Sequence, residues 1–428
     1  MPDHRSIRWL HAQLPALVEK GVLTRESADA LRAHFVQEEG SSGAGIIISA
    51  VLGATLIGAG IILVLAHNWD ELGKSARTVI SFAPLLAAIA LSAFAMLRRA
   101  SSAAWCEGAA IFQSLAVAAA IGLVGQTWHI AGDFFDFLLT WMLLCIPLVY
   151  LLRATSPAAF YIVGIASWAA GITSRDESAL WAWPLLALVV PFYGSVVWEK
   201  RHGHRANALS LLLALAVPVI FSCTLEHAAR TSWIPACAGL FAALYLAGVR
   251  WFENDDHHAH AFRTIGALGL AALAITLSYR GPWLIHDYGR ASDWRLERII
   301  GIGLPVLAVF FGWLCFTAKR DPNTLSAALP VAALGGWLCA RSSDAQVGLA
   351  MFFNGYALAL GVVTLIRGVR RRRIGGANAG MLLIAALVSS RFFDGDSSFV
   401  ARGAAFIVIG IGFLLANFYL FKRRQKAS

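Results

Sequence analysis

Residues 46–66 read IIISAVLGATLIGAGIILVLA and contain no charged side chain. A helix needs about 20 consecutive apolar residues to cross the hydrocarbon core of a bilayer. This stretch therefore predicts a membrane-spanning helix, and similar runs recur to the end of the chain. The composition agrees, because 58% of the 428 residues are hydrophobic and only 14% are charged, whereas a soluble domain carries about 25% charged residues.

The apolar runs predict an all-α polytopic transmembrane helix bundle with short loops. Long runs rather than short alternating segments exclude an outer-membrane β-barrel. We expect about fourteen spans, in a range of twelve to fourteen. They fall near 46–66, 76–97, 104–125, 134–152, 157–173, 179–198, 206–225, 232–252, 261–279, 299–318, 323–341, 346–366, 374–390 and 400–421.

The distribution of basic residues predicts the orientation. With fourteen spans, the loops on the side of the two termini hold 24 of the 35 Lys and Arg residues. Cytoplasmic loops carry such an excess, so we place both termini in the cytoplasm. The net charge of +10 then reflects topology and contact with the lipid bilayer, and we expect no nucleic-acid partner. The basic run at 367–373 is interpreted as a topogenic, lipid-facing cluster.

Three regions follow from this pattern. Residues 1–45 form a cytoplasmic segment of two short amphipathic helices, with Gly21 ending the first and Thr24 capping the second. Residues 46–155 form an N-terminal transmembrane region, and 156–428 hold the remaining spans and a short basic tail. A cytoplasmic partner would dock on residues 1–45 through an apolar face of Trp9, Leu10, Leu14 and Val18.

Known chemical motifs are missing from the sequence. The six cysteines form no C-x-x-C pair, which zinc and redox motifs use. We find no P-loop, dinucleotide fingerprint, H-E-x-x-H or G-x-S-x-G motif. No cofactor is therefore evident, and a non-enzymatic role is favoured over an enzymatic one.

Three polar clusters lie at span ends, in loops that the fourteen-span topology places on the extracytoplasmic face of the membrane. The first holds His67, Asn68, Trp69, Asp70 and Glu71. The second holds Gln126, Trp128, His129, Asp133 and Asp136. The third holds Arg391, Asp394, Asp396 and Arg402.

These clusters admit two interpretations. Imidazole and carboxylate groups converging on one face could bind a divalent cation or relay protons; His129, Asp133 and Asp136 have helical spacing, although Gly132 is expected to break the helix. Alternatively, Asp133 caps the fourth span and the tryptophans lie in an interfacial belt, and we favour this second interpretation. Glu107 is similarly interpreted as an acid at a helix N-terminus, which the helix dipole favours.

Three short motifs resemble one bacterial family. They are the segment from Gly21 to Leu31, the "AHNWD" of Ala66 to Asp70, and the "GQTWH" of Gly125 to His129. Together they resemble the predicted membrane proteins grouped as domain-of-unknown-function family 2157, over about residues 8–155, and the C-terminal stretch is similar to the end of its long members. The resemblance implies a bacterial inner-membrane location and no particular reaction.

The sequence is compatible with three functions. Many spans with small loops favour transport or export of a small solute or lipid-linked compound. A membrane scaffold or sensor for envelope assembly is the alternative, and a membrane-embedded transferase acting on a lipid-linked substrate is the least favoured. All three rest on architecture rather than on identified chemistry.

Overall fold

The computed structural model describes residues 13–15, 17–34, 72–201, 203–228, 232–252, 260–284, 294–340, 343–371, 373–392, 407 and 410–411. Every regular element within these residues is helical. The chain divides into two compact units, Met1–Arg77 and Thr78–Ser428.

The first unit contains two short helical segments, as the sequence predicts. Residues 17–19 are helical, and Gly21 ends this turn with a left-handed φ of +69°, which glycine adopts without steric cost. Helix α2 spans Arg25–His34, and the Ser27 N–H donates to Thr24 Oγ1 at 3.2 Å, so Thr24 is its N-cap. Leu14 is completely buried, so it is not available to the docking face expected of this segment. Trp9 and Leu10 lie outside the described residues.

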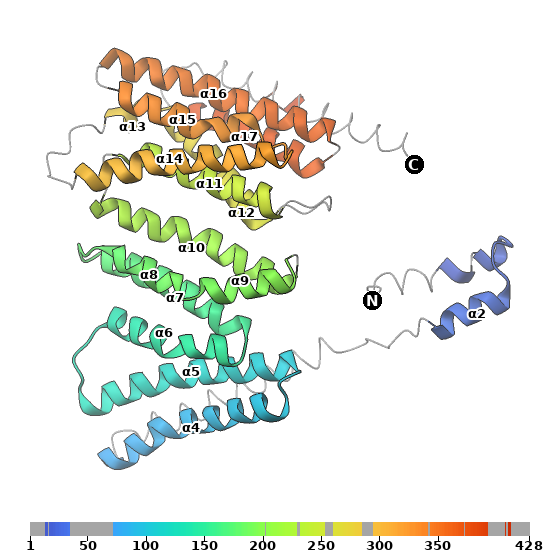
Figure 1. The fold of residues 1–428 in the computed structure, drawn as a ribbon, viewed down its shortest axis with the longest axis vertical. Coiled ribbons are helices and arrows are strands. Elements are labelled where there is room, and N and C mark those ends of the chain that lie inside the picture. The colour runs from blue at the N-terminus through green and yellow to red at the C-terminus, as the bar shows by residue number, and fades with distance from the viewer. Residues whose placement is uncertain are drawn as a thin grey trace. The chain divides into compact units, whose positions relative to one another are not determined.

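The second unit is a succession of helices, most of which pack against helices that are near them in the chain (Figure 1). In chain order they are α4 (Lys74–Arg98), α5 (Ala103–Trp128), α6 (Phe134–Leu151), α7 (Thr155–Thr173), η2 (Ala179–Trp181), α8 (Ala182–Ala187), α9 (Val190–Glu199), α10 (His204–Ala228), α11 (Trp233–Phe252), α12 (Ala261–Leu277), α13 (Gly281–Leu284), α14 (Trp294–Thr317), α15 (Thr324–Cys339), α16 (Ser343–Arg370) and α17 (Ile374–Phe392).

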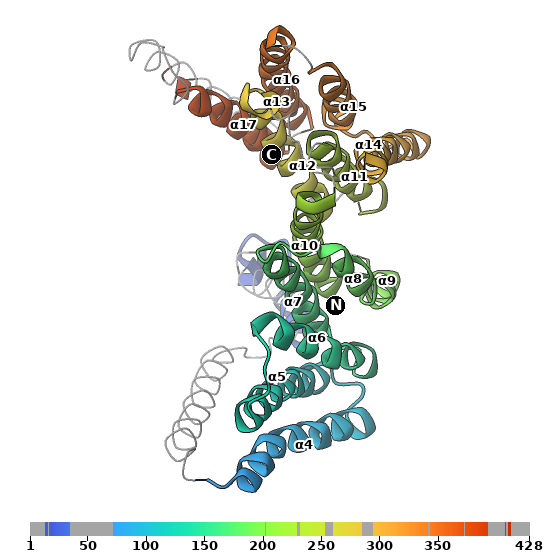
Figure 2. The same cartoon turned by 90° about the vertical axis from the view of Figure 1, so that its left-hand side faces the viewer.

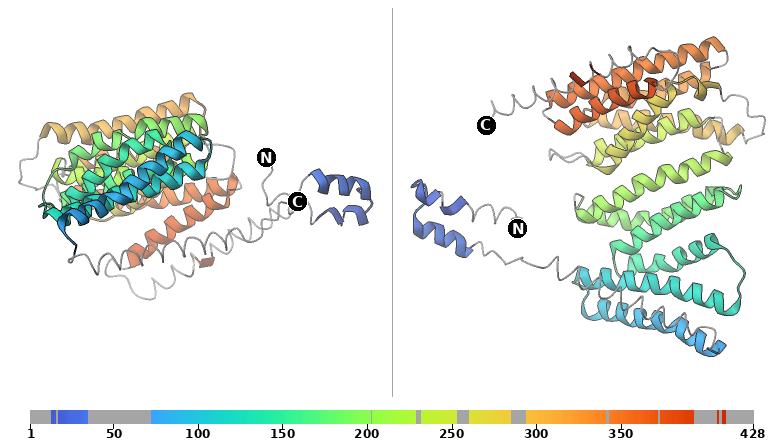
Figure 3. Two further views of the ribbon diagram at one scale, coloured as in Figure 1. Left: turned by 90° about the horizontal axis from the view of Figure 1, so that it is seen from below. Right: turned by 180° about the vertical axis from the view of Figure 1, so that it is seen from behind.

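The packing order in this unit follows the chain closely. Helices α5 and α6 pack with α7, α7 packs on α10, and α10 contacts α12. Helix α11 contacts α12, α14 and α15, and α16 packs along α17 (Figure 2). The axes of most helices are nearly parallel (Figure 3), and short connections make successive spans run in opposite directions. Two main hydrophobic cores result, one around Tyr161 and Ile165 and the other around Trp283 and Phe353.

Ten of the described helical segments are long and apolar enough to cross a membrane. Two further apolar helices, Ala261–Leu277 and Thr324–Cys339, are shorter. These twelve segments coincide with the twelve expected spans that fall within the described residues. The expected spans at 46–66 and 400–421 lie outside them. A multi-pass helical protein is therefore confirmed, and the count of fourteen stays a prediction.

Part of the basic cluster at 367–373 has an internal partner. Arg367 Nη2 lies 2.7 Å from Asp321 Oδ1, and Arg371 also pairs with the Asp321 carboxylate. Arg367 further donates to the Asp321 carbonyl oxygen at 2.8 Å. These two arginines therefore fix the α14–α15 connection to the end of α16. The interpretation of 367–373 as a lipid-facing cluster did not include this internal contact.

Helices α16 and α17 touch through glycines. A Cβ atom added at Gly368 would overlap the backbone of Ala377, and one at Gly380 would overlap that of Leu365. Small residues let helices approach closely where lipid supplies no hydrophobic drive for association. The backbones of these two helices are consequently in direct contact.

We predict that Gly368→Ala separates α16 from α17 and destabilises the protein by about 1–3 kcal/mol, the usual cost of overpacking. Gly355→Ala is the matched control, because a Cβ at this position of α16 meets no atom within 4 Å. Thermal unfolding in detergent, followed by loss of the monodisperse chromatographic peak, compares the two. Equal midpoints for both variants would contradict the close contact.

Candidate functional site

The span at Ala179–Glu199 is not one continuous helix. It consists of η2, α8 and α9, with a turn at Leu188 and Val189. Pro191 follows directly, and it has no N–H to donate to the carbonyl oxygen of Ala187. The sequence therefore ends the first half-helix and starts a second within a single apolar segment.

Two tyrosines bond to carbonyl groups at this break. Tyr161 on α7 donates to the carbonyl oxygen of Leu185 at 2.8 Å, and Tyr150 on α6 donates to that of Leu188. An unsatisfied backbone group costs several kcal/mol in hydrocarbon. The Leu185 carbonyl oxygen also accepts from the Leu188 N–H at 3.1 Å, so the Tyr150 hydroxyl is the group that supplies a partner at the break itself.

Helix α9 forms one wall of a cavity of about 930 Å³. The loop after α4 and the start of α5 contribute another wall, and the α6–α7 turn and the start of α10 complete it. The lining residues are Ala100, Ser101, Ala103, Cys106, Glu107, Tyr150, Leu152, Arg153, Ala154, Pro191, Phe192, Ser195, Val196, Trp198, Glu199 and Arg205.

Glu107 on α5 caps the start of α7. Its carboxylate accepts from the backbone N–H of Thr155 at 2.6 Å and of Ser156 at 2.9 Å, and also from the Ser156 hydroxyl. The N-cap residue of α7 is Ala154, which makes no side-chain cap hydrogen bond. The first N–H groups of a helix have no partner within it, so Glu107 supplies the missing acceptor. The acid does lie at a helix N-terminus, but at that of α7 rather than its own.

Arg205 on α10 holds the same turn from the other side. Its Nε donates to Thr155 Oγ1 at 2.7 Å, and its Nη2 donates to the carbonyl oxygen of Arg153. Arg153 has a left-handed φ of +48°, which is uncommon for a large side chain. Two charged side chains from different helices therefore fix the α6–α7 turn.

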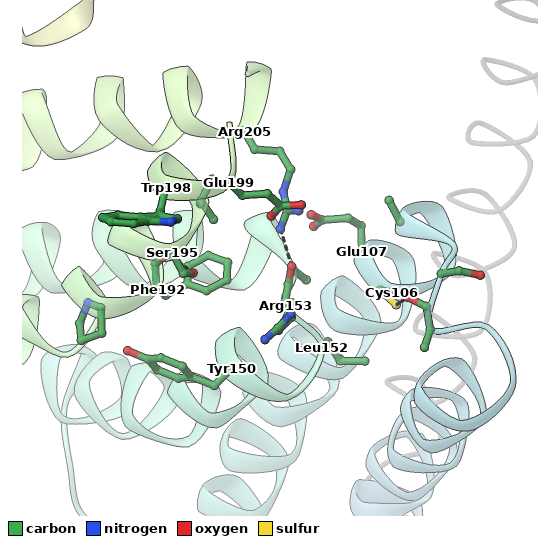
Figure 4. Close-up of a pocket in the computed structure, with 16 residues that line it drawn as sticks. Cys106, Glu107, Tyr150, Leu152, Arg153, Phe192, Ser195, Trp198, Glu199 and Arg205 are labelled. Atoms are coloured by element: carbon green, nitrogen blue, oxygen red, sulfur yellow. Dashed lines mark hydrogen bonds between the residues drawn. The ribbon is translucent and has the colours of Figure 1, made fainter. Parts of the chain in front are cut away.

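The cavity has a charged side and an aromatic side (Figure 4). Glu107, Glu199 and Arg205 point toward one another at one end, whereas Tyr150, Phe192 and Trp198 lie away from them. Within the described part of the chain, no hydrogen bond or ion pair involves the side chains of Arg153 and Glu199, and both are exposed. This arrangement suits a ligand that has both a charged and an apolar part.

The second predicted cluster is mostly a pair of helix caps. Asp133 accepts from the N–H groups of Phe135 at 2.7 Å and Asp136 at 3.0 Å, while the Asp133 N–H donates to the Asp136 carboxylate at 3.3 Å. Arg175 forms an ion pair with Asp133. Asp133 therefore caps α6, as the capping alternative states.

His129 has a different structural role. It is the C-cap of α5 with a left-handed φ of +52°, and its N–H donates to the carbonyl oxygen of Gly125. Because α5 ends at Trp128 and α6 begins at Phe134, His129 does not share a helical face with Asp133 and Asp136. Gln126 and Trp128 are exposed.

Arg391 of the third cluster ties three helices together. Its Nε donates to Asn354 Oδ1 at 3.0 Å and its Nη2 to Ser278 Oγ at 3.1 Å, and it stacks over the Tyr279 ring at 4.3 Å. Asn354 also donates to the Ser278 carbonyl oxygen at 3.0 Å. Arg391 thus joins the ends of α12 and α17 to α16.

Arg391, the described member of the third cluster, does not lie near the second cluster. Asp133 and His129 border α5 and α6, whereas Arg391 belongs to the α12–α16–α17 packing at the other end of the helix succession (Figure 1). All of the first cluster, His67 to Glu71, lies outside the described residues, as do Asp394, Asp396 and Arg402. In the described ranges no group of three or more His, Cys, Asp or Glu side chains is placed to hold a metal ion.

The helices described above define a multi-pass helical membrane protein. Residues 15–158 match the model of the family described as "Predicted membrane protein (DUF2157)", which confirms the resemblance seen in the sequence. The matched segment ends just past the α6–α7 turn, so it contains Glu107 and both N–H groups that Glu107 caps. No curated protein and no solved structure matches the chain.

We predict that Glu107→Ala destabilises the protein by about 1–3 kcal/mol, because buried donors at the start of α7 lose their acceptor. Glu107→Gln keeps one acceptor oxygen and should lose less. Glu199→Ala is the matched control, since Glu199 lines the same cavity without a described partner. Thermal unfolding in detergent measures all three. A midpoint of Glu107→Ala equal to that of Glu199→Ala would argue against the cap.

A second prediction concerns acid stability at Asp133. Hydrogen bonds from the Asp136 and Phe135 N–H groups, together with Arg175, lower the pKa of this carboxyl below its ordinary 3.8. A carboxyl whose pKa is lower in the folded than in the unfolded state stabilises the fold at any pH above the unfolded-state pKa. This stabilisation is lost as the pH falls through the folded-state pKa. Asp133→Asn keeps a cap acceptor without titrating. The stability difference between wild type and Asp133→Asn should shrink below about pH 4; a constant difference would refute it.

Proposed function

We propose that the protein binds a small solute or lipid-linked compound in the cavity beside α9 and carries it across the bilayer. The observation that carries this proposal is the broken span. Discontinuous helices form the binding sites of many transporters, because they expose backbone groups and allow one half-helix to move against the other. Here the half-helix α9 forms the cavity wall, and Tyr150 bonds to the break.

The dimensions and position of the cavity support the same function. Ligand sites commonly measure about 300–1,000 Å³, and this one measures about 930 Å³. It lies at the ends of α6 and α9 and the starts of α5, α7 and α10. The distribution of Lys and Arg supports placing these ends on the cytoplasmic side of a bacterial inner membrane, with both termini on that side.

Accessibility from both sides of the membrane tests transport without a known substrate. Ser195→Cys, introduced into a background lacking the six native cysteines, places a thiol in the cavity wall. A carrier that alternates between two open states should let a membrane-impermeant thiol reagent label this residue from the cytoplasmic and from the outer side. Ser210→Cys is the control, because Ser210 is fully buried in α10 and should stay unlabelled from both.

Labelling of Ser195→Cys from one side only would contradict transport through this cavity. Deleting residues 1–40 separates transport from the scaffold alternative. A transporter keeps its two-sided labelling after the deletion, whereas a scaffold that docks through this segment loses its partner.

A further inference from the structure

Two opposite charges at the cavity are left over after the structural bonds are made. The Glu107 carboxylate accepts hydrogen bonds from the start of α7. The Arg205 guanidinium donates to the Arg153 carbonyl oxygen and to Thr155 Oγ1. Arg153 and Glu199 also line the cavity, and within the described residues their side chains make no hydrogen bond or ion pair. The site therefore offers one unused cation and one unused anion.

These two charges lie on different sides of the cavity entrance (Figure 4). The Glu199 carboxylate is beside Glu107 and Arg205, whereas the Arg153 side chain points toward the side where Tyr150 lies. Glu199 is the last residue of α9, where the helix dipole already favours a cation. A ligand that carries a cation and an anion in one headgroup, separated by a short linker, matches this pair, whereas an ion of single charge leaves one of them unmatched.

The apolar wall reaches well beyond the charged entrance. From Glu199 to Pro191, α9 runs for eight residues, about 12 Å at the rise of an α-helix. The polar layer on each side of a bilayer is thinner than this, because the whole membrane is only about 10–15 Å thicker than its core. With Glu199 at the membrane surface, Pro191 and Phe192, about 12 and 10 Å along the helix axis from it, line the cavity below the polar layer.

The same wall continues onto the surface that faces lipid. Tyr150 is 44% exposed and Trp198 94% exposed, and the neighbouring Leu151 and Val190 are 59% and 50% exposed. Val190 lies far enough along α9 to face acyl chains, whereas Tyr150, Leu151 and Trp198 end α6 and α9 and face the interface, where tyrosine and tryptophan are enriched. An apolar chain in the cavity could thus pass directly into the bilayer.

We propose that the cavity binds a zwitterionic phospholipid with a primary-amine headgroup. Its phosphate pairs with Arg153, its ammonium group pairs with Glu199, and one acyl chain follows Tyr150, Phe192 and Val196 into the bilayer. This inference rests on the proposed function of the cavity as the ligand site, and it names the class of that ligand.

Lipid binding to the purified full-length protein tests this assignment. Native mass spectrometry gives apparent dissociation constants for dioleoyl phosphatidylethanolamine, phosphatidylglycerol and phosphatidylcholine, which share their acyl chains. We expect phosphatidylethanolamine to bind about tenfold more tightly than the other two, because only its headgroup offers Glu199 both N–H donors and a positive charge; the choline group has no N–H, and the glycerol headgroup has no cation. Glu199→Gln should bring the three constants to within about twofold of one another.

Arg153 has its own variants and control. Arg153→Asn should weaken all three lipids by about tenfold through loss of the phosphate partner, while asparagine tolerates the left-handed backbone. Arg153→Lys should restore most of the binding, which a merely structural defect would not allow. Lys319→Asn is the matched control, because Lys319 has a φ of +52° and does not line the cavity. Glu226→Gln is the matched control for Glu199→Gln. Glu226 lies near the C-terminal end of α10, away from the cavity that Arg205 lines at the N-terminal end of the same helix.

Unchanged lipid preference in Glu199→Gln, or unchanged affinity in Arg153→Asn, would overturn the proposal. Competition by free phosphoethanolamine at the same concentration as the lipid would overturn it too, because the acyl chain would then contribute nothing.

Proteoliposomes with acyl-labelled fluorescent phosphatidylethanolamine separate binding from movement. If the lipid binds as expected but does not cross the bilayer, the proposed transport fails and this inference stands. If it does not bind while Ser195→Cys still labels from both sides, this inference fails and transport stands.

Discussion

The carboxylate of Glu107, bonded to the N–H groups of Thr155 and Ser156, is the contact on which the cavity depends. Helix α7 begins at an alanine cap, which offers no side-chain acceptor to its half-buried first N–H groups. Glu107 supplies that acceptor from α5, and Arg205 secures the same turn from α10. The start of α7 is thereby fixed between two helices that also line the cavity.

The broken span follows from the same requirement. Pro191 removes one backbone hydrogen bond at the break, and Tyr150 donates to the Leu188 carbonyl there. Helix α9 packs through Phe192 and Val196 into the core that η2 and α8 also join, and it lines the cavity as well. The unmatched pair of Arg153 and Glu199 remains at the entrance, where a ligand can reach it.

Local features of this chain could be predicted from sequence, and long-range ones could not. Gly21, Thr24 and Asp133 act within two or three residues of themselves, so turn and cap preferences were enough to identify them. The apolar runs likewise located the described helices. Glu107 and Arg205, in contrast, find their partners about 50 residues away, and no spacing rule reports such a contact.

Two other features show the same limit. The break near Pro191 was visible only as one proline among several in apolar runs, and its tyrosine partners come from separate helices. Arg391 was selected for its polarity, but its partners on α12 and α16 give it a bracing role that its sequence neighbours do not suggest.

The most direct test of the account is a cryo-electron microscopy structure of the full chain in lipid nanodiscs. We predict a helix break at residues 188–189, the Glu107 carboxylate at the start of α7, and elongated density that runs from the Arg153–Glu199 entrance along Phe192. A continuous helix over 179–199 that closes the cavity would contradict it.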